Sequence, residues 1–251
     1  PASGNAGVLN GNTLVINGVG IQAAQGSDDD ASFENTGSTK AASAIAIAAA
    51  INKKSEMTGV TATAEPNTVR GSGFTAGVVT NINLNGVDIA TSLDADSKRD
   101  DVLNAINAYQ GQTGVTASAW GEGITLTAAD GRNITLDIDG AGGAAAIGLK
   151  DVEVGAAGDG TEAVAYYSTV KLSSDKAFAV ESGSEGDANF ANLGFRRGTF
   201  GGSDNALKIK DLDVTTQAGA TEALKAIDAA LTTVAADQAK AGAFQNRLDA
   251  V

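Results

Sequence analysis

The stretch Leu-Val-Ile-Asn-Gly at residues 14–18 returns in altered form as Ile-Asn-Leu-Asn-Gly at residues 82–86. Each stretch alternates like a β-strand and ends in an Asn-Gly pair, which is the strongest short signal for a β-hairpin. The two stretches therefore indicate an internal repeat. Both copies are therefore expected to begin with a hairpin.

The similarity continues beyond each hairpin. An Ala-rich apolar stretch follows and ends in Ile-Asn, at residues 51–52 in the first copy and 106–107 in the second. Next come Gly-Val-Thr-Ala-Thr-Ala at 59–64 and Gly-Val-Thr-Ala-Ser-Ala at 114–119, at the same distance from the Ile-Asn pair. The repeating unit therefore predicts strand, turn, helix and strand, twice in succession.

Helical spacing supports the middle of each copy. In the second copy the pattern predicts a helix from about Ser97 to Tyr109, and its apolar face is formed by Val102, Leu103, Ile106 and Tyr109. In the first copy it predicts a helix from about Thr39 to Lys53, capped by Ser38 or Thr39. The apolar stripe of this first helix consists of Ala44, Ile47 and Ile51.

The first copy also carries an insert near residues 26–38, which is acidic and polar and predicts a surface loop. After the second copy, residues 123–127 and 134–138 alternate strictly. The Asp-Gly pair at 130–131 between them predicts a third hairpin. A further pair of strands is expected at 166–173 and 177–181, and residues 182–206 are expected to form a connector with little regular structure.

Composition excludes several classes of protein. The 251 residues contain no His and no Cys, so Ser-His-Asp and Cys-His catalysis are excluded. A formal charge of −13 argues against nucleic acid and anionic membranes as partners. The longest apolar run, at residues 44–51, is much shorter than the roughly 20 residues that span a bilayer. We therefore expect a protein that is not an enzyme and that needs no cofactor.

Three acidic clusters could suggest calcium: 28–30, 94–101 and 137–139. None follows the ligand spacing of a calcium loop, so solvated loop charge is the favoured interpretation for each. Trp120 ends a predicted strand beside Gly121 and is interpreted as a partly exposed core residue rather than a ligand platform. The sequence alone therefore predicts no catalytic site and no metal site.

The last 40 residues differ in character from the rest. Apolar residues recur there at alternating spacings of three and four, which is typical of a coiled-coil seam on one long helix. The apolar members of this seam are Leu224, Ile227, Leu231, Val234, Ala241 and Leu248. A helix of this length predicts a partner helix rather than burial on its own domain.

Residues 213–216, 223–231 and the hexad Gly-Ala-Phe-Gln-Asn-Arg at 242–247 resemble bacterial flagellin, at the start of the C-terminal half of its helical core. The hairpin, Ile-Asn and Gly-Val motifs are similar to those of the variable outer region of many flagellins. The resemblance implies a truncated fragment of a structural subunit of the flagellar filament, secreted and extracellular. It implies other flagellin subunits as partners through the helical core.

The same resemblance implies a possible vertebrate toll-like receptor as a further partner, bound only weakly, with Gln245, Asn246 and Arg247 on the receptor-facing surface. Two alternatives remain open. The repeat motif also occurs in the filament-cap protein, and a secreted flagellin-like adhesin or carbohydrate-binding module could use the same scaffold. Stacked aromatic side chains on a concave surface would favour the last.

The expected fold class is α+β, mostly β, with small outer domains built from two strand–helix–strand repeats and one long C-terminal α-helix. Four segments are expected. Residues 1–75 hold the first repeat and 76–165 hold the second repeat with its hairpin. Residues 166–211 form strands and a connector back to the core, and 212–251 form the partial core helix.

Overall fold

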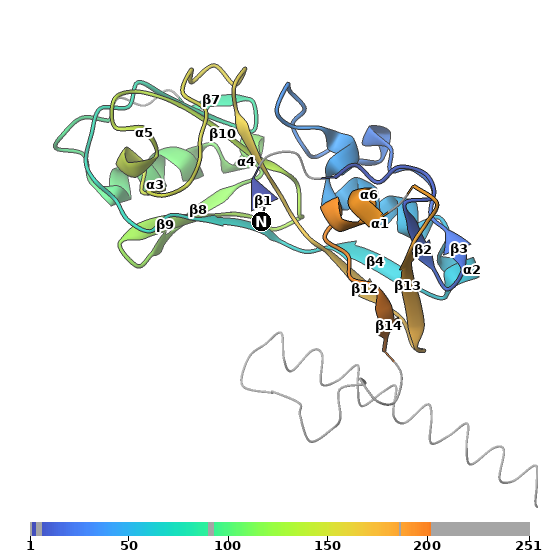
Figure 1. The fold of residues 1–251 in the computed structure, drawn as a ribbon. Helices are drawn as coiled ribbons and strands as arrows, with labels where there is room; N and C mark the ends of the chain where they lie inside the picture. The colour runs from blue at the N-terminus through green and yellow to red at the C-terminus, as the bar shows by residue number, and fades with distance from the viewer. Residues whose placement is uncertain (1, 4–6, 90–92, 186, 202–251) are drawn as a thin grey trace, which may run out of the picture. The chain divides into compact units, whose positions relative to one another are not determined.

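A computed structural model describes residues 2–3, 7–89, 93–185 and 187–201 (Figure 1). More of the chain lies in strands than in helices, as expected for a mostly β chain with short helices. The chain divides into two compact units, one of residues 1–174 and 179–198 and a second of residues 175–178 and 199–251. The predicted helix at 212–251 lies outside the described residues.

The two copies contain the same elements in the same order. In the first copy these are β2 (Leu14–Ile16), β3 (Val19–Gly20), α1 (Ala44–Asn52), α2 (Ser55–Thr58) and β4 (Thr61–Ala64). In the second copy they are β6 (Asn81–Leu84), β7 (Val87–Ile89), α3 (Arg99–Ala108), α4 (Gln110–Thr113) and β8 (Thr116–Trp120). The prediction that the two repeats share one topology is confirmed.

Both predicted Asn-Gly hairpins are present. Asn17 and Gly18 have φ angles of 52° and 77°, and Asn85 and Gly86 have 52° and 76°. Positive φ at both central residues is the type I′ geometry, whose twist matches that of the flanking strands. Asn and Gly are the residues that adopt this geometry at least cost, so the sequence signal and the turn have one cause.

Two further strands complete the second copy. Strand β8 turns tightly into β9 (Gly123–Ala128), and the two pair antiparallel with Ala117 opposite Leu126. Strand β10 (Ile134–Asp139) then pairs with β6, with Leu136 opposite Leu84. The complete module therefore has three strands, β8, β9 and β10, in addition to its hairpin and helices.

The first copy is completed by strands from far along the chain. Strand β4 pairs with β12 (Val170–Ser173), with Ala62 opposite Leu172, as Ala117 is opposite Leu126. Strand β2 pairs with β13 (Phe178–Ser182), with Ile16 opposite Val180. The predicted pairing of 166–173 with 177–181 is therefore wrong, because β12 and β13 pair with β4 and β2 and not with each other. The first module is thus discontinuous, and the second module is inserted into it at the point where β4 would otherwise turn back into β12.

Two strands connect the inserted module to its host. Strand β5 (Asn67–Arg70) pairs with β9, and β11 (Val164–Tyr167) pairs with β10. The inserted module therefore has a three-stranded sheet in the order β5-β9-β8 and a five-stranded sheet in the order β1-β11-β10-β6-β7, where β1 is Ala2–Ser3.

The predicted hairpin of residues 123–127 with 134–138 is wrong. Both strands form, but β9 lies between β5 and β8 while β10 lies between β11 and β6. Each strand already has a partner on both edges, so neither has an edge left to pair with the other. The Asp-Gly pair forms a turn, in which the Gly131 N–H donates to the Ala128 carbonyl, and this turn leads from one sheet to the other.

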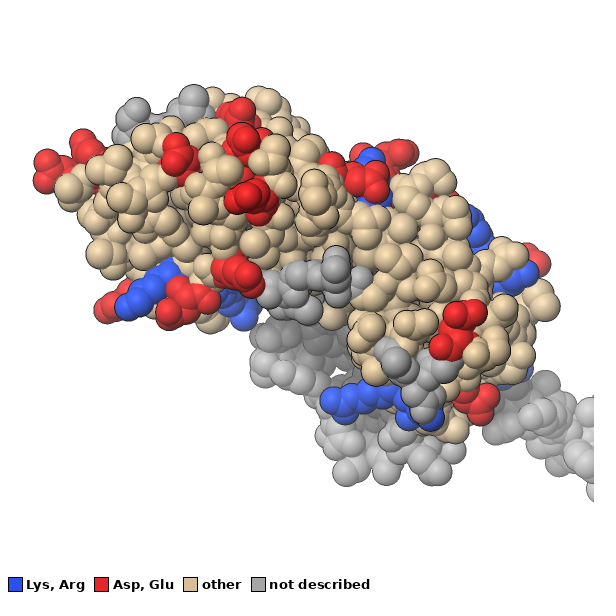
Figure 2. Space-filling view, turned by 45° about the horizontal axis from the view of Figure 1, so that its top comes forward, with Lys and Arg blue, Asp and Glu red and all other residues tan. Residues whose placement is uncertain are grey.

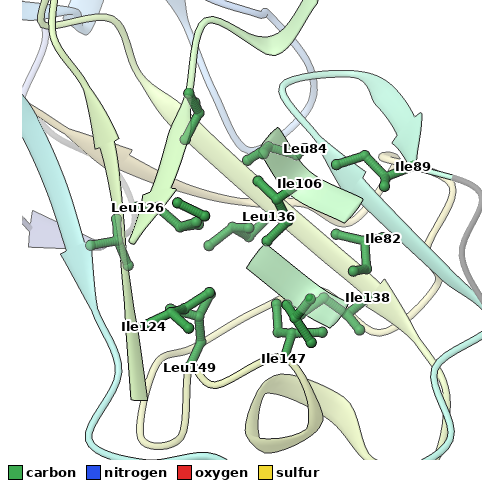
Figure 3. Close-up of a cluster of buried hydrophobic side chains, with 14 of the residues drawn as sticks. Ile82, Leu84, Ile89, Ile106, Ile124, Leu126, Leu136, Ile138, Ile147 and Leu149 are labelled. Carbon is green, nitrogen blue, oxygen red and sulfur yellow. The ribbon is translucent and has the colours of Figure 1, made fainter. Parts of the chain in front are cut away.

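One hydrophobic cluster fills the inserted module (Figure 3). Side chains from both sheets and from α3 meet in this cluster. Its fully buried side chains include Ile82, Leu84, Ile89, Ile106, Ile124, Leu126, Ile134 and Leu136. Burying a side chain of this size contributes roughly 1.5–3 kcal/mol. The Val, Ile and Leu content of the second copy therefore accounts for a core built almost without aromatic residues.

The first helix starts later than predicted. Residues 40–42 form a short 3-10 turn, and α1 begins after Ser43, whose hydroxyl accepts from the Ala46 N–H at 3.0 Å. The cap is therefore Ser43, not Ser38 or Thr39. The predicted stripe is buried, and most of the remaining helix surface is buried as well, because small Ala side chains let neighbouring segments approach.

The insert at residues 26–38 is not a simple surface loop. Its Asp29, Ser32 and Ser38 are buried, and the hydroxyl of Ser32 accepts from the N–H of buried Asn133 at 3.0 Å. The ring of Phe33 lies so close to Gly86 that a Cβ there would come within 2.3 Å of it. The insert therefore packs against the second module, which its polar composition did not indicate.

Four short elements remain: a 3-10 turn at Gly26–Asp28, α5 (Gly143–Ala146), α6 (Asp187–Asn192) and β14 (Gly198–Phe200). The last two fall within the predicted connector, so the expectation of little regular structure at 182–206 is wrong for its described part. Phe190 of α6 is buried, which gives this turn of helix an apolar anchor. Phe200 of β14 packs on Phe178 with 5.9 Å between ring centroids.

The repeat provides a matched pair of glycines for a stability test. Gly59 and Gly114 occupy the same position, with φ angles of 68° and 70°, but a Cβ at Gly59 meets nothing within 4 Å while one at Gly114 comes 2.2 Å from the Arg132 guanidinium. Replacing Gly59 by Ala should cost about 1 kcal/mol of unfolding free energy for the left-handed backbone. Gly114→Ala should cost about 1 kcal/mol more, because Arg132 must leave its contacts. Urea unfolding of both variants measures the difference, and equal losses would contradict the packing.

Candidate functional site

One Asn in each module joins the helix to the sheet. The Asn107 side chain donates to the Ala117 carbonyl at 2.9 Å and accepts from the Ala117 N–H at 2.8 Å. Asn52 makes the same pair of bonds with Ala62, at 2.8 and 2.7 Å. The doubled Ile-Asn motif was visible in the sequence, but its role as a clamp between helix and strand was not.

The turn Asn makes a second clamp. Asn85 donates through Nδ2 to the Thr113 carbonyl at 2.9 Å and accepts at Oδ1 from the Thr135 N–H at 2.8 Å. Asn17 makes the matching bonds to Thr58 and Ala179, at 2.7 and 2.8 Å. Each turn Asn thus connects a helix end to the last strand of its module by hydrogen bonds, which is a structural role.

The acidic cluster at 28–30 was predicted to be solvated loop charge, and Asp28 and Asp29 depart from this prediction. Asp28 forms an ion pair with Lys53 at 2.6 Å. Asp29 is fully buried, and its Oδ1 accepts from the backbone N–H groups of Ala31 and Ser32 at 2.9 Å each. Burial of Asp29 raises its pKa, but hydrogen bonds from Ser32, Ser43 and the two N–H groups outweigh burial and hold the pKa below its ordinary 3.8.

This shift makes a prediction about acid stability. A carboxyl whose pKa is lower folded than unfolded stabilises the fold fully above its unfolded pKa, and that contribution is lost as the pH falls through the folded pKa. Asp29→Asn should therefore reduce the unfolding free energy by about 1–3 kcal/mol at pH 6. The deficit should shrink as the pH drops below 3.8. Urea unfolding from pH 6 to pH 2 tests this, and a deficit independent of pH would refute it.

The cluster at 94–101 organises the start of α3. Asp94 accepts at Oδ1 from the Asp96 N–H at 2.9 Å, and Asp101 accepts from the Lys98 N–H at 2.8 Å. These are turn and helix-capping bonds, which satisfy N–H groups that the helix leaves free. The carboxylates of this cluster are exposed, as predicted for solvated loop charge, and two of them also have defined N–H partners.

Asp137 also departs from the expected solvated charge. It is fully buried on β10, its Oδ2 accepts from the Gly160 N–H at 2.9 Å, and its Oδ1 has no hydrogen-bond partner. Asp139, two residues on, is exposed and accepts from the Thr80 hydroxyl at 2.5 Å. Within the described ranges, no three acidic side chains are grouped so as to hold a metal ion.

Trp120 is not part of the core. Its side chain is 51% exposed, and the guanidinium of Arg70 lies 4.4 Å from the centre of its ring. A shallow groove nearby is lined by Phe74, Lys98, Arg99, Asp100 and Glu122. Sequence reasoning missed this groove because its residues come from three separate segments.

The predicted seam of Leu224, Ile227, Leu231, Val234, Ala241 and Leu248 lies outside the described residues. The same holds for Gln245, Asn246 and Arg247 of the hexad. Among the helices that the structure does describe, none is both long enough and apolar enough to cross a bilayer.

Comparison with known proteins gives two similar curated relatives. The chain is 30% identical over 160 residues to Flagellin A of Helicobacter mustelae. The aligned region covers 59% of this chain and 32% of that protein. It is 30% identical over 174 residues to Flagellin A of Helicobacter felis, covering 64% of this chain and 33% of that protein. No family model matches. The chain spans about a third of the length of these relatives, and its resemblance to flagellin is confirmed.

Proposed function

We propose that this chain is the surface-exposed variable region of a flagellin-like subunit of the bacterial flagellar filament, joined to part of the helical core. It would act outside the cell and serve motility by packing and display rather than by catalysis. The observation that carries the proposal is the similarity to two flagellins over roughly 60% of the chain.

The architecture supports a structural role. The two modules share one topology, and in each module Asn side chains, such as Asn107 and Asn85, hold the helical segment to the sheet by hydrogen bonds. Within the described residues, the buried carboxylates Asp29 and Asp137 accept from backbone N–H groups, so they serve local structure. A rigid module with a well-packed core suits a display role on a polymer surface.

Assembly with other flagellin subunits would run through the seam of the C-terminal helix, formed by the residues from Leu224 to Leu248 named above. The hexad residues Gln245, Asn246 and Arg247 would form part of a receptor-facing surface, and a vertebrate toll-like receptor would bind this chain only weakly. The reason is that an interface depends on a few central anchors. One helix supplies only part of such a set.

Immunogold electron microscopy tests the proposed role. Antibodies raised against the chain should decorate filaments along their length on cells that produce it, while the same serum depleted on the purified chain should not. Decoration confined to the filament tip would instead favour the cap protein. An absence of label on filaments, with label on the cell surface, would overturn the proposal and favour an adhesin.

A further inference from the structure

The first module carries one segment that the second module does without. Its connection from β3 to α1 runs over residues 21–43, whereas the matching connection from β7 to α3 is residues 90–98. The second module nevertheless forms the same hairpin, helices and strand. The insert at residues 26–38 is therefore not needed to build a module of this topology.

Two carboxylates hold the insert to its own module and set its path. Asp28 forms an ion pair at 2.6 Å with Lys53, the residue that caps the C-terminal end of α1. Asp29 is fully buried and accepts from the N–H groups of Ala31 and Ser32 at 2.9 Å each. These bonds fix the turn from which the rest of the insert continues.

Beyond that turn the insert makes hydrogen bonds to the second module. The Asn35 side chain donates to the Gly160 carbonyl at 2.7 Å, in the segment before β11. The Ser32 hydroxyl accepts from the Asn133 N–H at 3.0 Å, and the Ser38 hydroxyl accepts from the Asn133 side chain at 3.3 Å. Ser32, Ser38 and Asn133 are buried, so water does not readily replace a partner that is lost there.

The insert also fits the second module closely in shape. The ring of Phe33 lies against Gly86, in the turn between β6 and β7, where a Cβ would clash with it. A Cβ on Gly37 would lie 2.6 Å from the Ala163 carbonyl. Glycine at both places allows this close approach. The contacts therefore reach the β6–β7 turn, the start of β10 and the segment before β11.

The covalent joints between the modules would not fix their orientation alone. Residues 65–66 lead from β4 to β5, and residues 168–169 lead from β11 to β12. These joints lie side by side, because the Glu65 N–H donates to the Thr169 carbonyl at 2.9 Å. Two adjacent joints act as one pivot, and relative motion is the usual expectation for modules joined in this way. Both modules nevertheless fall within one compact unit.

Net charge does not hold the modules together. Both contain more acidic than basic residues, and acidic side chains are spread over the face that Figure 2 shows. Charge of one sign opposes close approach. The contacts of the insert with the second module are instead made by uncharged side chains.

We propose that residues 26–38 are a strap, which holds the inserted module in one fixed orientation on its host. The strap is anchored beside α1 and closes on three segments of the other module. It adds a contact away from the pivot, so the two modules turn together as one body. This role concerns the chain by itself and does not depend on the filament function.

The absence of Cys makes the test direct, because spin labels can be placed at chosen positions. Met57→Cys and Gln112→Cys put labels at matching exposed positions in α2 and α4, one in each module. Double electron–electron resonance should then give a single narrow distribution of label distances. Adding Ser32→Ala, Phe33→Ala and Asn35→Ala together should broaden that distribution about twofold, because the pivot is then free to turn.

A matched control changes the same strap without its contacts. Ser27→Ala, Asp30→Ala and Thr36→Ala replace three exposed residues of the insert and should leave the width of the distribution unchanged. ¹H–¹⁵N NMR spectra should show dispersed signals from both modules in either triple variant.

Three results would overturn the proposal. An unchanged width after the first triple substitution would show that other contacts, such as the pairing of β1 with β11, fix the orientation. Loss of the dispersed signals of the first module would show that the insert belongs to the fold of that module. A broad distribution before any change in the insert would show that the modules have no fixed orientation.

Discussion

Residues 1–75 expressed alone should remain unfolded, while residues 67–167 should fold cooperatively. The first segment contains β2 and β4 but lacks their partners β13 and β12, so β4 has no strand to pair with. An isolated hairpin is marginally stable at best. The second segment contains every member of the main hydrophobic cluster. Far-UV circular dichroism, urea unfolding and the dispersion of ¹H–¹⁵N NMR spectra measure the contrast.

The control for this prediction restores the missing strands. Residues 7–65 joined to 169–201 through a short turn, like the one between β8 and β9, should regain structure that 1–75 lacks. A dispersed spectrum from 1–75 alone would show that its strands need no distant partner. That result would contradict the discontinuous module.

Asn85→Ala should be among the most destabilising single substitutions in the second module. It leaves the Thr135 N–H without a partner and the Thr113 carbonyl with only the Arg132 guanidinium at 3.3 Å, and both Thr residues are fully buried. Each lost bond costs about 1–3 kcal/mol when the remaining group is buried. An Ala at the positive φ adds about 1 kcal/mol. We expect a total loss of about 3 kcal/mol or more in the unfolding free energy, measured by urea denaturation.

Two variants separate the causes of that loss. Asn17→Ala removes the matching bonds at an exposed turn, where water can replace them, so its loss should be clearly smaller. Asn85→Gly keeps the backbone angle and removes only the side-chain bonds, so it should lose less than Asn85→Ala. If all three variants unfold at the same urea concentration, the turn Asn is not a clamp.

The sequence predicted the local structure of each module well. Asn-Gly turns, the stripe of Ile47 and Ile51, and the repeated Gly-Val strand all depend on neighbours within a few positions. Their periodicity and turn chemistry therefore carry the signal directly. The second helix was found to within two residues at its start and one at its end.

Pairing between distant segments could not be predicted in the same way. Nothing local marks Val170–Ser173 as the partner of β4, and strands β9 and β10 look like a hairpin although each is already flanked on both edges. The prediction of a surface loop at 26–38 was wrong for a similar reason. Its polar residues are satisfied by Asn133, about a hundred positions away, so composition alone implied exposure.

The groove escaped prediction for the same reason. Phe74, Arg99 and Glu122 are separated by more than twenty residues each, and none belongs to a recognisable motif. Trp120 was predicted to be a partly exposed core residue, and its side chain is 51% exposed with the Arg70 guanidinium over its ring.

The nesting of one module inside the other also sets an order for mechanical unfolding. Along the covalent chain, tension applied at residues 7 and 201 reaches the inserted module only through the segments that leave β4 and enter β12. Those segments are held together where the Glu65 N–H donates to Thr169 at 2.9 Å and the Ser168 hydroxyl donates to Glu65. While these pairs hold, the load carried by the covalent chain passes from β4 to β12 without entering the inserted module. Under load the outer module must therefore unfold first. The inserted module then stays folded and can still extend the chain when it unfolds later.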